Sequence, residues 1–298
     1  LGLSVIFGVV RVVNFAHGQM YMIGAFVAWW VMAATGLPYP VAVVAAVLLG
    51  AVLGAVMQRL FLRLTLSQDL VSLMIVTLGF GQALEGAAGL AFGPKPQTLA
   101  SPFQEMSVHL GPVWFTVQDA ILVSATILVF AGLYLALHRS WLGAAVRMVA
   151  EDPRLTTLGG LRVSRIYMGI FAFEGAAVAF AAALVAPRTP ILTSMGFDQV
   201  VMTFVVVVLG GIGNVGGVVL GAILLTALPE ALRYLGPMQE QWLGRVVVDP
   251  SGLRMLMFGL ALVLIMLFRP AGLWPSKTRQ RELAGLTVQP AASGKHDG

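Results

Sequence analysis

The sequence predicts an all-α fold, a polytopic bundle of transmembrane helices with about eight or nine membrane segments. Of its 298 residues, 58% are apolar and only 10% are charged, whereas about a quarter of the residues of a typical soluble domain are charged. Lipid is therefore the expected outer solvent, and each spanning segment must be helical because lipid offers no hydrogen-bond partner to an open strand edge. The chain has no cysteine, which excludes disulfides and thiolate metal sites.

Apolar segments separated by polar or glycine-rich breaks define the expected helices. The run before Arg11 is too short to cross a bilayer, which takes about 20 helical residues, so we expect a truncated N-terminus and only the end of a first helix. The glycine-rich stretch 210–217 predicts a hairpin of two helices, the first of them short. The later segments are 18–35, 40–58, 70–91, 119–137, 166–186, 198–212, 216–235 and 253–268.

The positions of the basic residues predict the orientation. The 18 Lys and Arg lie mostly in short loops and the tail, a pattern that indicates cytoplasmic segments rather than nucleic-acid binding. We expect a transmembrane domain over 1–275 with a cytoplasmic loop at 138–165, and a disordered cytoplasmic tail at 276–298. Loops 92–118 and 187–197 would face outward. The cytoplasmic groups are Arg59 with Arg63, then Arg139, Arg147, Arg154, Arg162 and Arg165, then Arg269, Lys277, Arg279, Arg281 and Lys295.

No soluble catalytic or nucleotide-binding domain is recognisable. The chain has no GxxxxGK[ST] phosphate-binding loop, and neither an HExxH motif nor a serine-nucleophile signature. Its four histidines are scattered and do not indicate a metal centre. We therefore expect that the chain is not an enzyme, binds no metal and holds no cofactor of its own.

The loop 138–165 is too long and too structured to be only a connector. GAAVRMVAEDP predicts a short helix with no breaker until Pro153, and RLTTLGG predicts a second that ends at Gly159 and Gly160. Two interpretations stay open: an amphipathic connector that rests on lipid headgroups, or a docking element for a cytoplasmic partner. The charged contacts of a docking element would come from Arg147, Glu151, Asp152 and Arg154.

Three motifs resemble the permeases of branched-chain amino acid ABC importers. LGAAVRMVAEDPRLTTLGGLRVSRI resembles the cytoplasmic coupling segment, FGVVRVVNFAHGQMYMIGAF the opening signature of the LivH-type subunit, and VVLGGIGNVGGVVLGAILL a third family motif. Together they extend from residue 1 to about 270. The resemblance implies a multi-pass subunit of the bacterial inner membrane that moves branched-chain or other apolar amino acids. Its implied partners are a second homologous permease, two cytoplasmic ATPases that bind the ATP, and a periplasmic or extracellular substrate-binding protein.

Residues 14–19, NFAHGQ, place hydrogen-bonding side chains inside an apolar stretch. Asn14 is expected to cap a helix that begins near Ala16, and Gly18 to allow the close approach of another helix. His17 would lie near the cytoplasmic end of the bundle. Two interpretations stay open: a hydrogen-bonded helix entrance at the membrane surface, or a cytoplasmic gate that moves when the ATPases close.

Ionisable residues inside apolar segments are the first candidates for a substrate path, because each costs about 2.5–3.5 kcal/mol at a helix centre. Glu85 and Glu174 lie at mid-segment. Family members usually carry an amide near the first position and an apolar residue near the second, so both acids are departures from the family pattern. The two would either hydrogen-bond to one another or line the path. The candidate path residues are Thr77, Gln82, Glu85, Glu174 and Asn214.

Other functions compete with amino-acid import. Urea or a short amide is the rival cargo within the family. A stand-alone secondary transporter would use Glu85 and Glu174 as proton or ion sites, but it would not need the coupling-like loop. An intramembrane enzyme is a third alternative, although no nucleophile and base lie at a suitable spacing.

Overall fold

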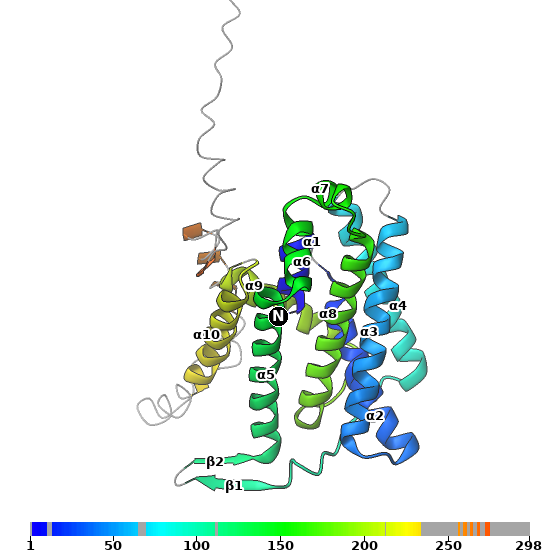
Figure 1. The fold of residues 1–298 in the computed structure, drawn as a ribbon. Coiled ribbons are helices and arrows are strands. Elements are labelled where there is room, and N and C mark those ends of the chain that lie inside the picture. Colours follow the sequence, from blue (N-terminus) through cyan, green and yellow to red (C-terminus); the bar gives the residue numbers. More distant parts are fainter. Residues whose placement is uncertain are drawn as a thin grey trace, which may run out of the picture. The chain divides into compact units, whose positions relative to one another are not determined.

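A computed structural model describes most of the chain, which is mainly helical in those parts (Figure 1). The chain divides into two compact units, Leu1–Thr203 and Phe204–Gly298. Residues 236–252, most of the predicted segment 253–268 and the predicted disordered tail 276–298 lie outside the described residues. The described residues are 2–10, 14–64, 70–110, 113–211 and 213–233, with a few more between 256 and 274.

The helices agree with the predicted apolar segments to within a few residues at most of their ends. In the described part of the first unit, the chain order is α1 (Gly2–Val10), α2 (His17–Thr35), α3 (Tyr39–Leu64), α4 (Leu70–Phe92), β1 (Ser107–Leu110), β2 (Val113–Thr116), α5 (Val117–Arg139), α6 (Trp141–Glu151), α7 (Pro153–Leu158), α8 (Val163–Val185), the 3-10 turn η1 (Ala186–Arg188) and α9 (Met195–Gly210). Helix α9 continues into the second unit, where α10 (Val215–Arg233) follows it.

Four helices in the described part are long and apolar enough to cross a membrane: Tyr39–Leu60, Val71–Phe92, Val117–Arg139 and Val163–Arg188. Helices α9 and α10 form a fifth candidate if they count as one span, bent by 118° at the glycine break. The eight or nine predicted segments are therefore not confirmed. Helix α2 is not among the candidates because His17 and Gln19 lower its hydropathy.

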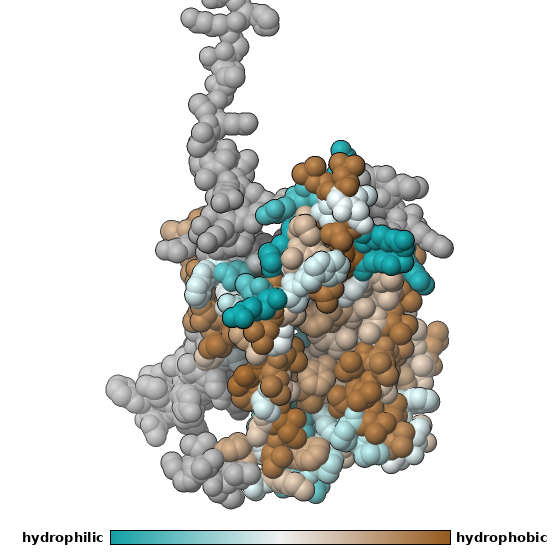
Figure 2. Space-filling model, in the orientation of Figure 1, coloured by the Kyte–Doolittle hydropathy of each residue, from teal (hydrophilic) through white to brown (hydrophobic). Residues whose placement is uncertain are grey.

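The exposed side chains of the long helices are those expected against lipid. Val44, Leu48 and Val52 of α3 are all more than half exposed and lie four residues apart, which places them on one helix face. Figure 2 shows apolar residues over the long helices, with hydrophilic ones gathered toward the end of the first unit that carries α7. The chain is thus a multi-pass helical protein with an apolar outer surface.

The predicted helical fold is confirmed in the described residues, with one addition: β1 and β2 pair as an antiparallel hairpin in the predicted outer loop. One prediction needs correction. Arg59 and Arg63 do not lie in a loop, since α3 continues through Leu64. No glycine or proline interrupts residues 55–64, so the helix extends beyond its apolar segment.

Opposite ends of the first unit carry α7 and the β-hairpin (Figure 1). At the hairpin end, the backbones of Gln97 and Ile191 exchange both N–H···O bonds, at 3.0 and 2.8 Å. Loops 92–118 and 187–197 therefore lie at the same end, as predicted. Buried Gln118 closes this end by donating through Nε2 to the Leu184 carbonyl at 2.8 Å and to the Tyr39 hydroxyl at 3.2 Å.

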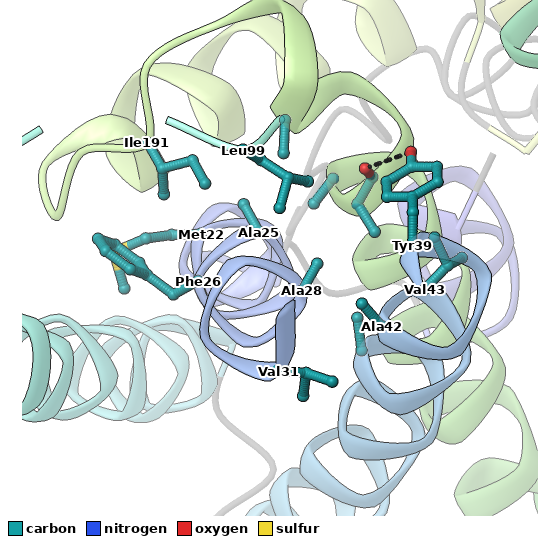
Figure 3. Close-up of a cluster of buried hydrophobic side chains, with 14 of the residues drawn as sticks. Met22, Ala25, Phe26, Ala28, Val31, Tyr39, Ala42, Val43, Leu99 and Ile191 are labelled. Carbon is teal, nitrogen blue, oxygen red and sulfur yellow. Dashed lines mark hydrogen bonds between the residues drawn. The ribbon is translucent and has the colours of Figure 1, made fainter. Parts of the chain in front are cut away.

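The largest core of the first unit surrounds α2. Its side chains, among them Met22, Ala25 and Phe26, meet residues of α3 and α8 and the loop residues Leu99 and Ile191 (Figure 3). The rings of Phe26 and Phe92 stack with their centroids 4.8 Å apart. Packing therefore holds α2 between α3, α4 and α8, which fixes where its first turn lies.

Glycines let α3 and α8 approach until their backbones touch. A Cβ at Gly50 would overlap the Gly175 carbonyl oxygen, and a Cβ at Gly54 would overlap that of Phe171. Gly50 and Gly54 lie at GxxxG spacing, which is typical of close helix packing. In the second unit, Gly217 packs in the same way against Gly210.

Gly50→Ala is expected to destabilise the protein by about 1–3 kcal/mol, because the new methyl group would overlap the α8 backbone. Gly86→Ala is the matched control, since a Cβ there meets no atom within 4 Å. Alanine at that position should be neutral or stabilising. Thermal unfolding in detergent micelles measures both, and equal melting temperatures would contradict the packing argument.

Candidate functional site

The most buried acid of the described residues lies at the middle of α8 and is held by two residues of the NFAHGQ motif. Asn14 Nδ2 donates to Glu174 Oε2 at 2.8 Å, and His17 Nδ1 lies 2.8 Å from Glu174 Oε1. The exposed fractions are 1% for Asn14, 7% for His17 and 0% for Glu174. Both carboxylate oxygens are thus occupied by side chains from the start of α2.

Local hydrogen bonds orient the motif toward Glu174. Asn14 Oδ1 accepts the Ala16 N–H at 3.0 Å, the bond predicted two residues on. Helix α2 begins only at His17, with Ala16 as its N-cap residue and no side-chain cap, so Asn14 closes the turn before the helix rather than capping it. Because its oxygen is fixed in this way, the amide nitrogen of Asn14 is the end that faces Glu174. Thr77 of α4 adds a further contact, since its Oγ1 accepts the Phe15 N–H at 3.2 Å. We call Asn14, His17, Thr77 and Glu174 the polar junction.

Gly18 brings a further helix to the polar junction. A Cβ at Gly18 would overlap the carbonyl oxygen of Gly196 in the first turn of α9. The predicted close approach of a neighbouring helix is therefore confirmed, and the neighbour is α9. The motif joins α2 to α4, α8 and α9.

Burial sets the energetics of the junction. A carboxylate removed from water loses several kcal/mol of solvation, which only good hydrogen bonds or an opposite charge offset. Asn14 supplies a neutral donor and His17 a donor that can also carry a positive charge. Nδ1 is the ring nitrogen on Glu174, which leaves Nε2 for another partner. The arrangement is a hydrogen-bonded link between helices with an ionisable group at its centre.

This geometry corrects two predictions. Glu174 does not pair with Glu85, because Asn14 and His17 occupy its two oxygens. The NFAHGQ motif does not lie at a membrane surface either, because it meets α8 at mid-helix, where hydrogen-bond partners come from other helices rather than from water.

The other predicted path residues are dispersed. Thr77 belongs to the polar junction, whereas Gln82 is exposed and Glu85 is half-buried and makes no hydrogen bond or ion pair with any described residue. In the second unit, Asn214 Oδ1 accepts the Gly216 N–H at 3.1 Å, and its Nδ2 donates to the Trp274 carbonyl at 2.9 Å. Asn214 therefore caps α10 and closes the glycine turn. A role of these residues in transport stays a prediction.

The loop 138–165 contains the two short helices that its sequence predicts, α6 and α7. Asp152 links them, because it ends α6 and its Oδ1 accepts the N–H groups of Arg154 at 2.7 Å and Leu155 at 3.1 Å. Pro153 is the first residue of α7 rather than a stop signal alone. Gly159 follows the last residue of α7, and Gly160 has a φ of +83° that favours glycine.

A fixed corner joins α5 to α6. Ser140 Oγ accepts the Gly143 N–H at 3.1 Å, and the Arg147 guanidinium donates to the Leu137 carbonyl. A Cβ at Gly143 would overlap that same carbonyl oxygen. Arg147 is therefore a structural residue of the corner. Sequence reasoning missed Gly143, although its place beside a Ser helix cap was a usable signal.

Of the charged residues proposed for docking, Glu151 and Arg154 are exposed and make no side-chain ion pair with a described residue. Two leucines of α7 are exposed beside them, Leu155 by 65% and Leu158 by 84%. Two exposed leucines on a six-residue helix contribute to stability only when another surface covers them and removes them from water. This surface fits both a docking element and a connector that rests on lipid.

Among the described residues, no group of three His, Asp or Glu lies close enough together to hold a metal ion. The polar junction has an acid and a histidine but no Ser, Thr or Lys nucleophile bonded to the histidine, as covalent catalysis requires. Its chemistry is that of a buried link within a membrane-spanning helical bundle.

Comparison with known proteins assigns this bundle to a family. The sequence model of the family described as "Branched-chain amino acid transport system / permease component" matches residues 1–266. The chain belongs to this family of permeases. No solved structure matches it.

Three relatives show the relationship. The chain is 30% identical over 287 residues to the high-affinity branched-chain amino acid transport system permease protein BraD of Pseudomonas aeruginosa, covering 92% of this chain and 89% of BraD. It is 27% identical over 245 residues to LivH of Escherichia coli, with 78% and 79% covered. It is 29% identical over 309 residues to LivM of Salmonella typhimurium, with 95% and 68% covered. The relatives support the LivH-type assignment.

A double-mutant cycle tests the link between α2 and α8. His17→Ala and Glu174→Ala should show an interaction energy of about 0.5–3 kcal/mol, because the two side chains are in direct contact. The free energy of unfolding in mixed micelles, titrated with a denaturing detergent, measures it. The control cycle pairs His17→Ala with Glu85→Ala, and these effects should add within about 0.5 kcal/mol. Additivity in both cycles would show that the link contributes nothing to stability.

Proposed function

We propose that this chain is the membrane-spanning permease subunit of an ABC importer in the bacterial inner membrane. The observation that carries the proposal is the family match over residues 1–266. The structure supports it with candidate membrane spans and with a folded two-helix loop, α6–α7, at one end of the first unit. The proposed partners are a second homologous permease, two cytoplasmic ATPases and an external substrate-binding protein.

The proposed cargo is a branched-chain or other apolar amino acid. The relatives BraD, LivH and LivM are named as high-affinity branched-chain amino acid permeases. ATP is bound and hydrolysed by the partner subunits, because this chain lacks a phosphate-binding loop of the GxxxxGK[ST] type. Urea or a short amide remains the alternative cargo for the same mechanism.

The α6–α7 loop is the proposed docking element for an ATPase. Its exposed face combines Glu151 and Arg154 with the apolar pair Leu155 and Leu158, and its corner with α5 is fixed by Gly143 and Arg147. A rigid corner transmits movement, whereas a flexible one would absorb it. Arg147, Asp152, Pro153, Gly159 and Gly160 then shape the element rather than contact the partner.

A contiguous route leads from this loop to the polar junction. Helix α6 packs against α1, α5 and α8. At the first residue of α1, a Cβ at Gly2 would lie 3.1 Å from Glu174 Cγ. A displacement of α6 would therefore reach Glu174 through α1 and α8. In this proposal, Asn14, His17 and Gly18 form the moving contact of a gate.

Reconstitution tests the function. Proteoliposomes would hold the full-length chain with its neighbouring permease, ATPases and binding protein, and uptake of radiolabelled leucine and of urea would be measured with and without internal ATP. We expect ATP-dependent leucine uptake. Uptake of urea alone would change the cargo, and leucine uptake by this chain alone without ATP would overturn the importer mechanism in favour of a secondary transporter.

Leu158→Ser probes docking directly. We expect it to lower substrate-stimulated ATP hydrolysis by about tenfold, since a polar side chain would weaken an apolar contact with the ATPase. The melting temperature should not change, because the side chain is 84% exposed in this chain. Met106→Ser, at an exposed apolar residue of the outer loop, is the control. Unchanged hydrolysis in the Leu158 variant would favour the lipid-resting connector.

Asp152 needs two variants, because it is both an acid and the cap of α7. Asp152→Ala removes the α7 cap, with an expected loss of about 1 kcal/mol in helix stability. Asp152→Asn removes only the charge and keeps a capping oxygen. If stimulated hydrolysis falls in the alanine variant and survives in the asparagine variant, Asp152 acts as a cap. If hydrolysis falls equally in both, the Asp152 carboxylate contacts the partner.

A further inference from the structure

A cavity lies between the helices of the first unit near the α6–α7 loop. Its volume is about 660 Å³, which is within the range of sites for molecules larger than a single amino acid. Helices α1, α5, α6 and α8 form its walls. The walls are largely apolar and include Val5, Leu133, Leu137, Trp141, Ile166 and Phe173.

Two arginines are the only charged residues that line this cavity in the described part of the chain. Arg162 immediately precedes α8 and Arg165 lies in its first turn, three positions later, so that both lie near one side of the helix. Both are exposed, and neither makes a side-chain ion pair with another described residue. The cavity therefore has a cationic edge and an apolar interior, with no acid to neutralise the edge.

Helix stability does not account for the two arginines. Cations at a helix N-terminus are unfavourable, because the helix dipole is positive there. The Arg162 side chain makes no capping hydrogen bond either. An anion at this position would neutralise both guanidinium groups, which no acid lining the cavity does.

We propose that this cavity binds an anionic phospholipid of the cytoplasmic leaflet. Arg162 and Arg165 hold the phosphate group, and the apolar walls from α1, α5 and α8 hold the first part of the acyl chains. Basic pockets between transmembrane helices are suited to anionic headgroups. Trp141, which is 67% exposed, lies at the edge in the manner of an interfacial aromatic residue. The inference rests on the membrane placement of the proposed function.

A bound lipid would connect the membrane to the docking element. The same cavity is lined by Trp141, Leu142, Ala145 and Val146 of α6 and by the first turns of α8. Its occupant therefore contacts both the helix that leads into α7 and the helix that carries Glu174. Anionic lipid should stabilise the arrangement of α6 against α8.

The test is a binding measurement on the purified full-length chain, which needs no transport partner. Delipidated protein is titrated with phosphatidylglycerol and, separately, with phosphatidylcholine of the same chains, and bound lipid is counted by native mass spectrometry. We expect the double variant Arg162→Gln/Arg165→Gln to bind phosphatidylglycerol about tenfold more weakly. The control Arg139→Gln/Arg154→Gln removes the same charge at exposed arginines outside the cavity and should bind like the unmodified chain.

A second variant tests the apolar part without touching the charges. Gly132 lines the cavity, and a Cβ there meets no atom within 4 Å, so the side chain of Gly132→Phe starts in open space on the cavity wall. Phosphatidylglycerol binding should fall in this variant too. Displacement of the lipid by inorganic phosphate at equal concentration would show a soluble-anion site instead. Equal binding of the two lipids, or equal loss in both double variants, would overturn the lipid proposal while leaving the transport function untouched.

Discussion

An acid in the middle of an apolar helix is stable in a membrane only when other groups satisfy it, because neither water nor lipid does so at that depth. Glu174 is such an acid. Asn14 Nδ2 donates to one of its carboxyl oxygens, and His17 Nδ1 lies at hydrogen-bond distance from the other. The start of α2 must therefore lie at the depth of the α8 midpoint. That requirement places the preceding turn, the contact of Phe15 with Thr77 and the approach of Gly18 to Gly196. Contacts from α2, α4, α8 and α9 thus converge around one buried acid.

Backbone contact is the second condition that the fold depends on. Hydrogen bonds of the junction reach across α2 and α8 only if these helices are close to each other. Helix α3 packs closely on α8 through Gly50, Gly54 and Gly175, and a Cβ at Gly24 of α2 would lie 2.6 Å from Ala179 Cα. Small residues remove the side-chain layer that normally separates two helices. Close packing and a satisfied acid thus require each other.

The two ends of the first unit are built by different means. At the hairpin end, Gln118, Tyr39 and Leu184 form a buried network, and Asp119 and Arg188 make an ion pair at 2.5 Å. At the other end, local caps fix α6 and α7, while the outer face of α7 stays apolar and uncovered. A permease that a partner moves from one side needs one end that buried contacts hold in place. It also needs an uncovered surface at the other end, where the partner can bind. The lipid cavity lies beside the open surface, where the membrane can influence it.

The sequence by itself determined the class of protein, the positions of the helices and the short-range caps. Apolar runs and glycine breaks act within a few residues, so they predict α2 to α5, α8 to α10 and the α6–α7 pair closely. The bond from the Ala16 N–H to Asn14 Oδ1 was predicted for the same reason, although it closes the turn before α2 rather than capping the helix. Only the tertiary structure decided that Glu174 pairs with His17 rather than with Glu85, because that choice depends on contacts between residues 157 positions apart. The role of Gly143 and the pocket beside Arg162 and Arg165 likewise arise from helices that meet in space, which the pattern of a single segment does not specify.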